Sequence, residues 1–253
     1  SSAAADVYKR QREIIPYVIT TLNAIMAFLL ALLIGWSNPL DLQAVVPQEG
    51  QGLNPLLQNP AMAIHPPALY LGFIGFSVPF AFAMGGLMRG KLDNEWVLTT
   101  RRWTLMSWYF LSAGLILGGQ WAYEELGWGG FWAWDPVENA ALMPWLTGTA
   151  FLHSVMIQEK RNMLKIWNVV LIITTFGLTI IGTFLTRSGI INSVHSFTQS
   201  EIGPAFLVYL ALVLIAGFAL LFKRIQMLES EYKIESVLCR ENVFLAQNIL
   251  LVG

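Results

Sequence analysis

Six long apolar segments dominate this sequence, and they restrict the chain to folds that place helices in a lipid bilayer. A helix needs about 17–25 apolar residues to cross the hydrocarbon core, and lipid offers its backbone no hydrogen-bond partners. Only 12% of the residues are charged, about half of the roughly 25% found in soluble domains. We therefore predict an all-α, polytopic transmembrane bundle. The expected segments are residues 14–36, 68–88, 103–119, 137–157, 166–185 and 204–222.

A seventh apolar segment starts near residue 243, and the sequence stops at Gly253 before that segment is long enough to cross a bilayer. The first residue is Ser1 rather than methionine. We therefore expect residues 1–253 to form a single membrane domain that is part of a longer protein.

The basic residues lie almost entirely on one side of these segments. Of the 15 Lys and Arg residues, all but Arg187 lie before the first segment, after the sixth, or in the second–third and fourth–fifth connections. Cytoplasmic loops of membrane proteins carry the excess of Lys and Arg. This side is therefore predicted to be cytoplasmic, and residues 37–67, 120–136 and 186–203 are predicted to face outward.

One outward stretch, residues 118–145, is unusually rich in tryptophan. Its sequence, GGQWAYEELGWGGFWAWDPVENAALMPW, holds five of the ten tryptophans in the chain. Aromatic residues at a membrane boundary serve either as an interfacial anchor or as a platform for a flat, apolar ligand. Five in one segment exceed what an anchor needs, which favours a platform. The five are Trp121, Trp128, Trp132, Trp134 and Trp145.

Four acidic residues lie in the same stretch. Asp135 directly precedes Pro136, and Glu138 follows. This pattern is typical of a helix N-terminus, where Asp caps, Pro suits the first turn and Glu favours the positive end. We expect Asp135 to be this cap. Glu124 and Glu125 are expected to be solvated, with no sugar-binding context around them.

The chain has only three histidines, and their positions differ. His65 and His195 lie in outward segments on either side of the tryptophan-rich stretch, and Arg187 lies close to His195. Imidazole is the commonest metal ligand and a frequent axial ligand of haem iron. An outward pair beside a tryptophan platform suits a porphyrin, with Arg187 facing a propionate. The alternative is that each outward histidine is simply a solvated loop residue.

His153 differs from the other two because it lies inside the fourth apolar segment. An ionisable residue at membrane depth is a functional candidate, although a neutral imidazole bonded to a neighbouring Ser or Thr is the alternative. It lies about 24 Å from a helix start at Val137, or about 13 Å from one after Pro144. His153 is then too deep to share an iron with the outward pair, which predicts two separate haem sites.

Other features exclude several classes of protein. The only cysteine is Cys239, which rules out an intrachain disulfide and is predicted to lie on the cytoplasmic side as an incidental residue. The sequence contains neither the C-x-x-C-H motif of a c-type cytochrome nor a phosphate-binding P-loop. A net charge of −1 gives no bulk attraction to nucleic acid.

Four stretches resemble one known group of membrane proteins. WGGFWAWDPVENAALMPWL is similar to the WWD domain of the haem-handling protein superfamily, which includes CcmC, CcmF and CcsA. The other three stretches, from about Asn54, Thr147 and Gly182, are NPLLQNPAMAIHPPALYLGFIGFSVPFAFAMG, TGTAFLHSVMIQEKR and GTFLTRSGIINSVHSF. Together they resemble the CcmF family of haem lyase components from system I cytochrome c maturation. The resemblance runs from about Ala24 onward, and the close paralogue that serves nitrite reductase maturation is the alternative within this family.

The resemblance implies roles for the three histidines. His65 and His195 match the outward histidines proposed to ligate incoming haem, which makes them the candidate catalytic residues. His153 matches a membrane histidine that ligates a permanent b-type haem. That haem has a second axial histidine on a later span, and no histidine follows His195 here. The candidate cofactor-binding residues of the outward surface are Trp121, Trp128, Trp132, Trp134, Asp135 and Arg187.

The resemblance further implies a reaction, partners and a location. Haem arrives on the periplasmic chaperone CcmE, and its vinyl groups are joined to the thiols of a C-x-x-C-H apocytochrome c. The b haem reduces the incoming iron with electrons from a quinol, and a CcmH-type subunit takes part. The expected location is the bacterial inner membrane, in contact with lipid.

Three other functions compete with a haem lyase. A haem transporter would show inverted repeats or paired broken helices, and neither is evident in the sequence. A scaffold without chemistry would not need His153 in the membrane. A chaperone-loading protein of the CcmC type is the nearest rival, and the resemblance implies that such proteins lack the buried histidine.

Overall fold

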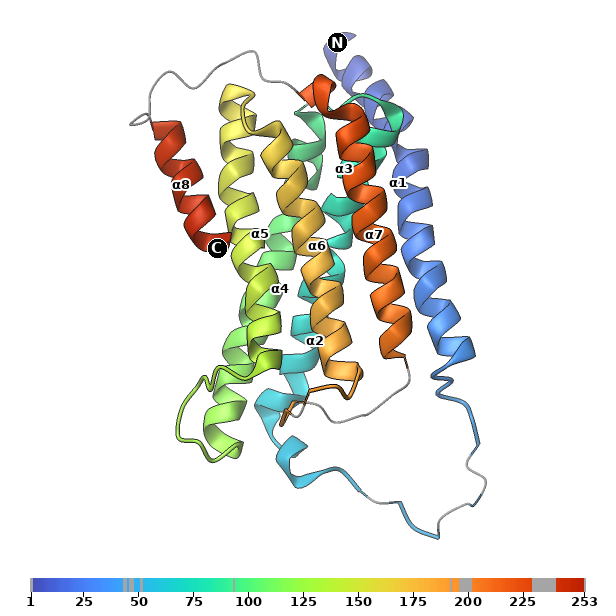
Figure 1. The fold of residues 1–253 in the computed structure, drawn as a ribbon, viewed down its shortest axis with the longest axis vertical. Helices are drawn as coiled ribbons and strands as arrows, with labels where there is room; N and C mark the ends of the chain where they lie inside the picture. Colours follow the sequence, from blue (N-terminus) through green and yellow to red (C-terminus); the bar gives the residue numbers. More distant parts are fainter. Residues whose placement is uncertain are drawn as a thin grey trace.

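The chain folds as a bundle of long helices that run roughly along one axis (Figure 1). The computed structural model describes residues 2–42, 45, 48–50, 52–92, 94–191, 193–195, 202–228 and 240–252. This described part contains helices and loops but no strand, which confirms the predicted all-α class. The helices are α1 (Ser2–Gly35), α2 (Pro60–Gly75), α3 (Ser77–Arg89), α4 (Glu95–Glu125), α5 (Pro136–Arg161), α6 (Lys165–Arg187), α7 (Gly203–Arg224) and α8 (Arg240–Val252), with short 3₁₀ turns η1 (Pro55–Leu57) and η2 (Ile225–Leu228).

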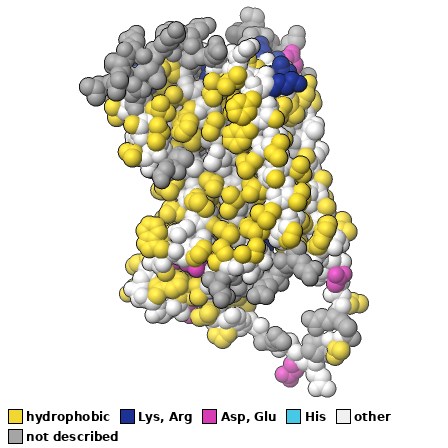
Figure 2. All heavy atoms as spheres, viewed as in Figure 1, with side chains coloured by type: hydrophobic (Ala, Val, Ile, Leu, Met, Phe, Trp, Pro, Cys, Tyr) yellow, Lys and Arg dark blue, Asp and Glu magenta, His cyan; other side chains and the backbone are white. Residues whose placement is uncertain are grey.

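The surface of the bundle is that of a multi-pass membrane protein. Hydrophobic side chains cover the face in Figure 2, and its Lys and Arg side chains gather at the end where the N-terminus lies. Five described stretches are long and apolar enough to cross a membrane. They are Glu13–Gly35, Pro60–Arg89, Pro136–Arg161, Lys165–Arg187 and Gly203–Leu228. The predicted segment 103–119 lies inside α4, a helix that extends beyond this segment at both ends. Helix α4 is not one of the five stretches that are apolar enough to cross a membrane.

The second apolar segment begins earlier than predicted and consists of two helices, α2 and α3, which meet at Phe76. Asn59 caps α2 by accepting a hydrogen bond from the backbone N–H of Ala61, and Pro60 takes the first helical position. Pro66 and Pro67 therefore lie inside the helix, where their missing N–H groups leave earlier carbonyls without helical donors. As a result, His65 is a helical residue rather than part of a loop.

Helices α2 and α4 pack closely because glycines line both sides of their interface. A Cβ atom on Gly72 would lie 2.6 Å from the backbone nitrogen of Leu111, and one on Gly114 would lie 2.8 Å from the Cα of Leu69. Small residues let helix backbones approach closely in membrane proteins. This approach carries His65, on α2, directly against α4.

Hydrogen bonds between side chains connect the other helices inside the bundle. Thr175 on α6 donates to Thr147 on α5 over 2.9 Å. Near the opposite end of these helices, Asn168 donates to Gln158 over 2.7 Å, and Gln158 donates to Asn94 over 3.1 Å. Such bonds stabilise helix association because the alternative is an unsatisfied polar group in an apolar interior.

We predict that Gly72→Ala destabilises the bundle. The added methyl group overlaps the Leu111 backbone, and overpacking of this kind costs about 1–3 kcal/mol, which outweighs a gain of about 1 kcal/mol in helix propensity. Thermal unfolding of the detergent-solubilised protein should therefore occur at a lower temperature. Gly35→Ala is the control, since nothing lies within 4 Å of its Cβ position. A Gly72→Ala variant that melts at or above the wild-type temperature contradicts the packing argument.

Candidate functional site

His65 is held against α4 by a hydrogen bond to the backbone. Its Nδ1 atom lies 2.6 Å from the carbonyl oxygen of Gly114. A carbonyl only accepts, so Nδ1 carries the proton and Nε2 keeps its lone pair. Gly118 makes room for the ring, because a Cβ atom there would lie 2.5 Å from the imidazole Cε1.

His195 is held in the same way, but by a carboxylate. Its Nδ1 atom lies 3.2 Å from Oδ2 of Asp135. The same oxygen accepts a hydrogen bond from the Ser193 hydroxyl over 2.7 Å, and the backbone N–H of His195 donates to that hydroxyl over 3.0 Å. Donation from Nδ1 leaves Nε2 of His195 as the nitrogen available to a metal.

Asp135 is the N-cap of α5, as predicted. Its Oδ2 atom accepts from the backbone N–H of Val137 over 3.0 Å, and Glu138 completes a capping box by accepting from the backbone N–H of Asp135 over 3.2 Å. The sequence pattern predicted this local role. It did not reveal the contact with His195, which lies 60 positions away in the chain.

Two cavities meet at the histidine pair, and both are lined by His65 and His195. The narrower one, of about 40 Å³, has an apolar wall that includes Leu115 and Trp132. The larger one, of about 190 Å³, extends to Arg187. Together they form the histidine cleft, which is apolar on one side and cationic on the other. The cleft is smaller than the roughly 300–1,000 Å³ of typical ligand sites, so a porphyrin would have to widen it.

The tryptophans do not form the flat platform expected from the sequence. Trp121 lies within α4, is fully buried, and meets His195 edge-on with ring centroids 5.4 Å apart. The ring centroid of Trp128 lies 6.4 Å from that of His195. Trp132 and Trp134 are nearly perpendicular, and Trp134 is 72% exposed.

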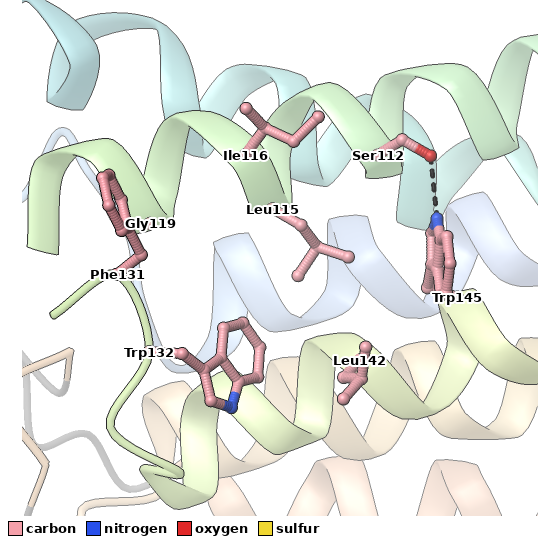
Figure 3. A pocket seen from close by; sticks show the side chains of 8 residues that line it. All are labelled: Ser112, Leu115, Ile116, Gly119, Phe131, Trp132, Leu142 and Trp145. Carbon is pink, nitrogen blue, oxygen red and sulfur yellow. Dashed lines mark hydrogen bonds between the residues drawn. The ribbon is translucent and has the colours of Figure 1, made fainter.

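The fifth tryptophan, Trp145, lies deeper in the bundle and belongs to an apolar pocket between α4 and α5. The pocket measures about 390 Å³ and is lined by Leu115, Ile116, Phe131, Trp132 and Trp145 among others (Figure 3). Trp145 donates to Ser112 Oγ over 2.8 Å and stacks on Trp108. Leu115 and Trp132 also line the histidine cleft, so the pocket and the cleft share a wall.

The acidic pair Glu124 and Glu125 ties α4 to the start of α2 rather than being only solvated. The Asn59 amide donates to Glu124 over 2.8 Å and to Glu125 over 3.0 Å. Nearby, the Trp121 indole donates to the backbone carbonyl of Leu56 over 2.7 Å. The hydrogen bond from Asn59, followed by one from Gln120, lowers the pKa of Glu124.

His153 lies apart from the cleft, within α5. The helix begins at Pro136 and continues through Pro144, which supports the greater of the two expected depths. By the rise of an α-helix, His153 is about 25 Å along the axis from the start of α5. Its Nδ1 atom is buried and has no hydrogen-bond partner among the described residues. The bond to a neighbouring Ser or Thr, which was the alternative to a functional role, is therefore not made by this nitrogen. Cys239 lies outside the described residues.

Comparison with known proteins gives a consistent result. Residues 6–191 match the family model described as cytochrome C assembly protein. The chain is 47% identical over 225 residues to the cytochrome c-type biogenesis protein CycK of Bradyrhizobium diazoefficiens, an alignment that covers 89% of this chain and 34% of that protein. It is 44% identical over 243 residues to CcmF of Escherichia coli K12, covering 95% of this chain and 37% of that protein.

Two further similarities widen the comparison. The probable cytochrome c-type biogenesis protein NrfE of Escherichia coli K12 is 42% identical over 216 residues, covering 84% of this chain and 39% of that protein. A solved structure of the cytochrome c haem lyase CcmF superimposes with a TM-score of 0.74 at 36% identity, covering 94% of this chain and 34% of that one. The chain thus spans little more than a third of the length of these relatives.

We predict that Asn59→Asp destabilises the junction of α2 and α4 in a pH-dependent way. Aspartate keeps the cap on α2 but replaces the amide donor with a third carboxylate. In the wild type, the lowered pKa of Glu124 gives stability that is present above the ordinary glutamate pKa of about 4.3. This contribution is lost as the pH falls through the lowered pKa. The variant should therefore melt earlier than wild type at pH 7, and the difference should shrink as the pH falls below about 4.3 towards the lowered pKa of Glu124.

Asn54→Asp is the matched control for this prediction. Asn54 caps η1 by accepting from Leu56 N–H, and no described contact joins it to a carboxylate. This variant should follow the wild-type pH profile. A constant difference between Asn59→Asp and wild type across the pH range would refute the role assigned to the acidic pair.

Proposed function

Because this chain belongs to the cytochrome c assembly protein family, we propose that it is the haem-handling part of a CcmF-type haem lyase. In this proposal the outward cleft holds substrate haem between His65 and His195 while the haem is joined to apocytochrome c. The main observation in support is that both imidazoles donate a hydrogen bond through Nδ1, His65 to Gly114 and His195 to Asp135. Both rings therefore keep Nε2 for iron.

The walls of the cleft support a porphyrin as its ligand. One side offers Leu115 and the Trp132 ring, which suit the apolar macrocycle. The other side offers Arg187, whose guanidinium suits a propionate. His195 follows the end of α6 in a loop, and its side chain lines the cleft.

The attachment needs orientation more than acid–base catalysis. Each vinyl group of haem adds one cysteine thiol of a C-x-x-C-H motif. A C–S bond forms, the thiol hydrogen passes to the other vinyl carbon, and no net oxidation occurs. Two axial imidazoles would fix the plane of the haem while the apocytochrome approaches, and holding reactants in position is a large source of rate enhancement.

We also propose that His153 is an axial ligand of a resident b-type haem. A buried, unpartnered Nδ1 fits this assignment, because burying a polar atom without a partner is costly. When bound, such a haem supplies one-electron transfer, here to the substrate iron, with a quinol as the source of electrons. The second axial ligand would come from outside this chain's three histidines.

The partners follow from the same proposal. We infer that haem is received from CcmE, that an apocytochrome c is the acceptor, and that a CcmH-type subunit assists. The cleft would face the periplasm of a bacterial inner membrane, since Arg187 is the only basic residue predicted to lie on that side.

Single histidine variants test the two haem sites separately. We expect His65→Ala and His195→Ala each to weaken binding of added ferric haem while leaving the copurifying b-type signal unchanged. His153→Ala should remove the b-type signal in a pyridine haemochrome assay but retain the low-spin spectrum of haem added to the outward cleft.

Each variant serves as the control for the other site. Thermal unfolding should confirm that all three variants remain folded. A b-type signal that persists at full strength in His153→Ala overturns the resident haem. Ferric haem that binds equally well to His65→Ala, His195→Ala and wild type overturns the outward site.

A further inference from the structure

The two outward histidines have chemically different hydrogen-bond acceptors. His65 donates to the neutral carbonyl of Gly114, whereas His195 donates to the carboxylate of Asp135. We propose that Asp135 is a positioning residue that makes His195 the stronger of two unequal axial ligands. This inference rests on the proposed function and assigns a task to a residue whose local role is only to cap a helix.

The carboxylate is fixed by three donors that converge on one oxygen. Oδ2 of Asp135 accepts from Val137 N–H at 3.0 Å, from the Ser193 hydroxyl at 2.7 Å and from His195 Nδ1 at 3.2 Å. The side chains of Asp135 and His195 are each only 12% exposed. Limited access to water strengthens a charged hydrogen bond of this kind. The His195 ring is thereby oriented relative to the first turn of α5.

Capping alone does not explain this arrangement. An N-cap needs one hydrogen bond to the first turn, and Glu138 already completes the capping box. The bonds from Ser193 and His195 come from a separate loop, 58 and 60 positions away. The His195 ring also contacts the buried Trp121 in a T-shaped arrangement with an interplanar angle of 68°. Both contacts restrict the rotation of the ring.

The hydrogen bond from His195 to the Asp135 carboxylate affects how strongly His195 binds iron. A carboxylate that accepts from the distal nitrogen of a histidine raises the basicity of the metal-binding nitrogen. His195 would therefore bind ferric iron more strongly than His65 and favour the ferric over the ferrous state. An unequal pair gives the iron one firm ligand and one that is released more readily. This asymmetry suits a protein that must hold haem and then release it with the apocytochrome c.

Asp135→Asn separates the two roles of this residue. Asparagine caps helices about as well as aspartate, but it offers a neutral oxygen to His195. We would titrate ferric haem into the detergent-purified protein carrying His153→Ala and measure both its affinity and the reduction potential of the bound haem. Ferric affinity should fall about tenfold or more, which is typical when the hydrogen-bond partner of a metal-binding histidine is replaced. The reduction potential should rise, because the ferrous form loses less affinity.

Glu138→Gln is the matched control. It removes one negative charge from the same helical turn and the same cleft, and glutamine preserves a capping box. Its ferric affinity should fall less, and its reduction potential should rise less, than in Asp135→Asn, because it loses a charge but no hydrogen bond to His195. A second comparison is independent of Asp135 itself: His195→Ala should weaken ferric haem binding more than His65→Ala.

The outcomes distinguish this inference from the proposed function. If the parent protein binds no haem through His65 and His195, the proposed function fails. If haem binds but Asp135→Asn and Glu138→Gln shift the potential equally, a through-space charge effect replaces the hydrogen bond and the inference fails. Equal losses of ferric and ferrous affinity in Asp135→Asn, with a lower melting temperature, would reduce Asp135 to a helix cap.

Discussion

The close contact between α2 and α4 is the constraint on which the histidine cleft depends. Gly72 and Gly114 bring the two backbones within reach, and only at that distance does the Gly114 carbonyl accept from His65. Gly118 then leaves the space that the imidazole occupies. A larger residue at any of these three positions would shift His65 relative to the rest of the cleft. The orientation of this histidine is therefore determined by the packing of α2 against α4.

The N-terminus of α5 fixes the other half of the site. Its cap, Asp135, collects hydrogen bonds from the helix and from the loop that carries His195. The two histidines are thus anchored to different helices by different chemistry, one to a peptide carbonyl and one to a carboxylate. Both anchored imidazoles line the cleft, even though His195 lies in a loop.

The apolar segments predicted the helices, and the Asp-Pro-x-Glu pattern predicted the cap at Asp135, because both signals are local. Contacts across the fold were not predictable in this way. Asn59 meets Glu124 only because two helix ends lie together, and Asp135 meets His195 only because the loop after α6 lies against the start of α5. The tryptophans read as one surface in sequence, but the helical extension of α4 buries Trp121 while Trp134 points outward. The length of α4 therefore determines that Trp121 is buried in the bundle and that Trp134 is exposed.

Helix α4 has a consequence for how the protein is made. It lies between α2 and α5 in the contacts of the bundle, yet it is not among the stretches apolar enough to enter lipid by composition. Such a segment partitions poorly by itself and is retained when neighbouring helices cover its polar face. Its most extensive partner, α2, precedes it in the chain, so the helix that covers α4 has already been made when α4 is synthesised. The histidine cleft itself is complete only after α6 and the loop behind it have been made, because that loop carries His195.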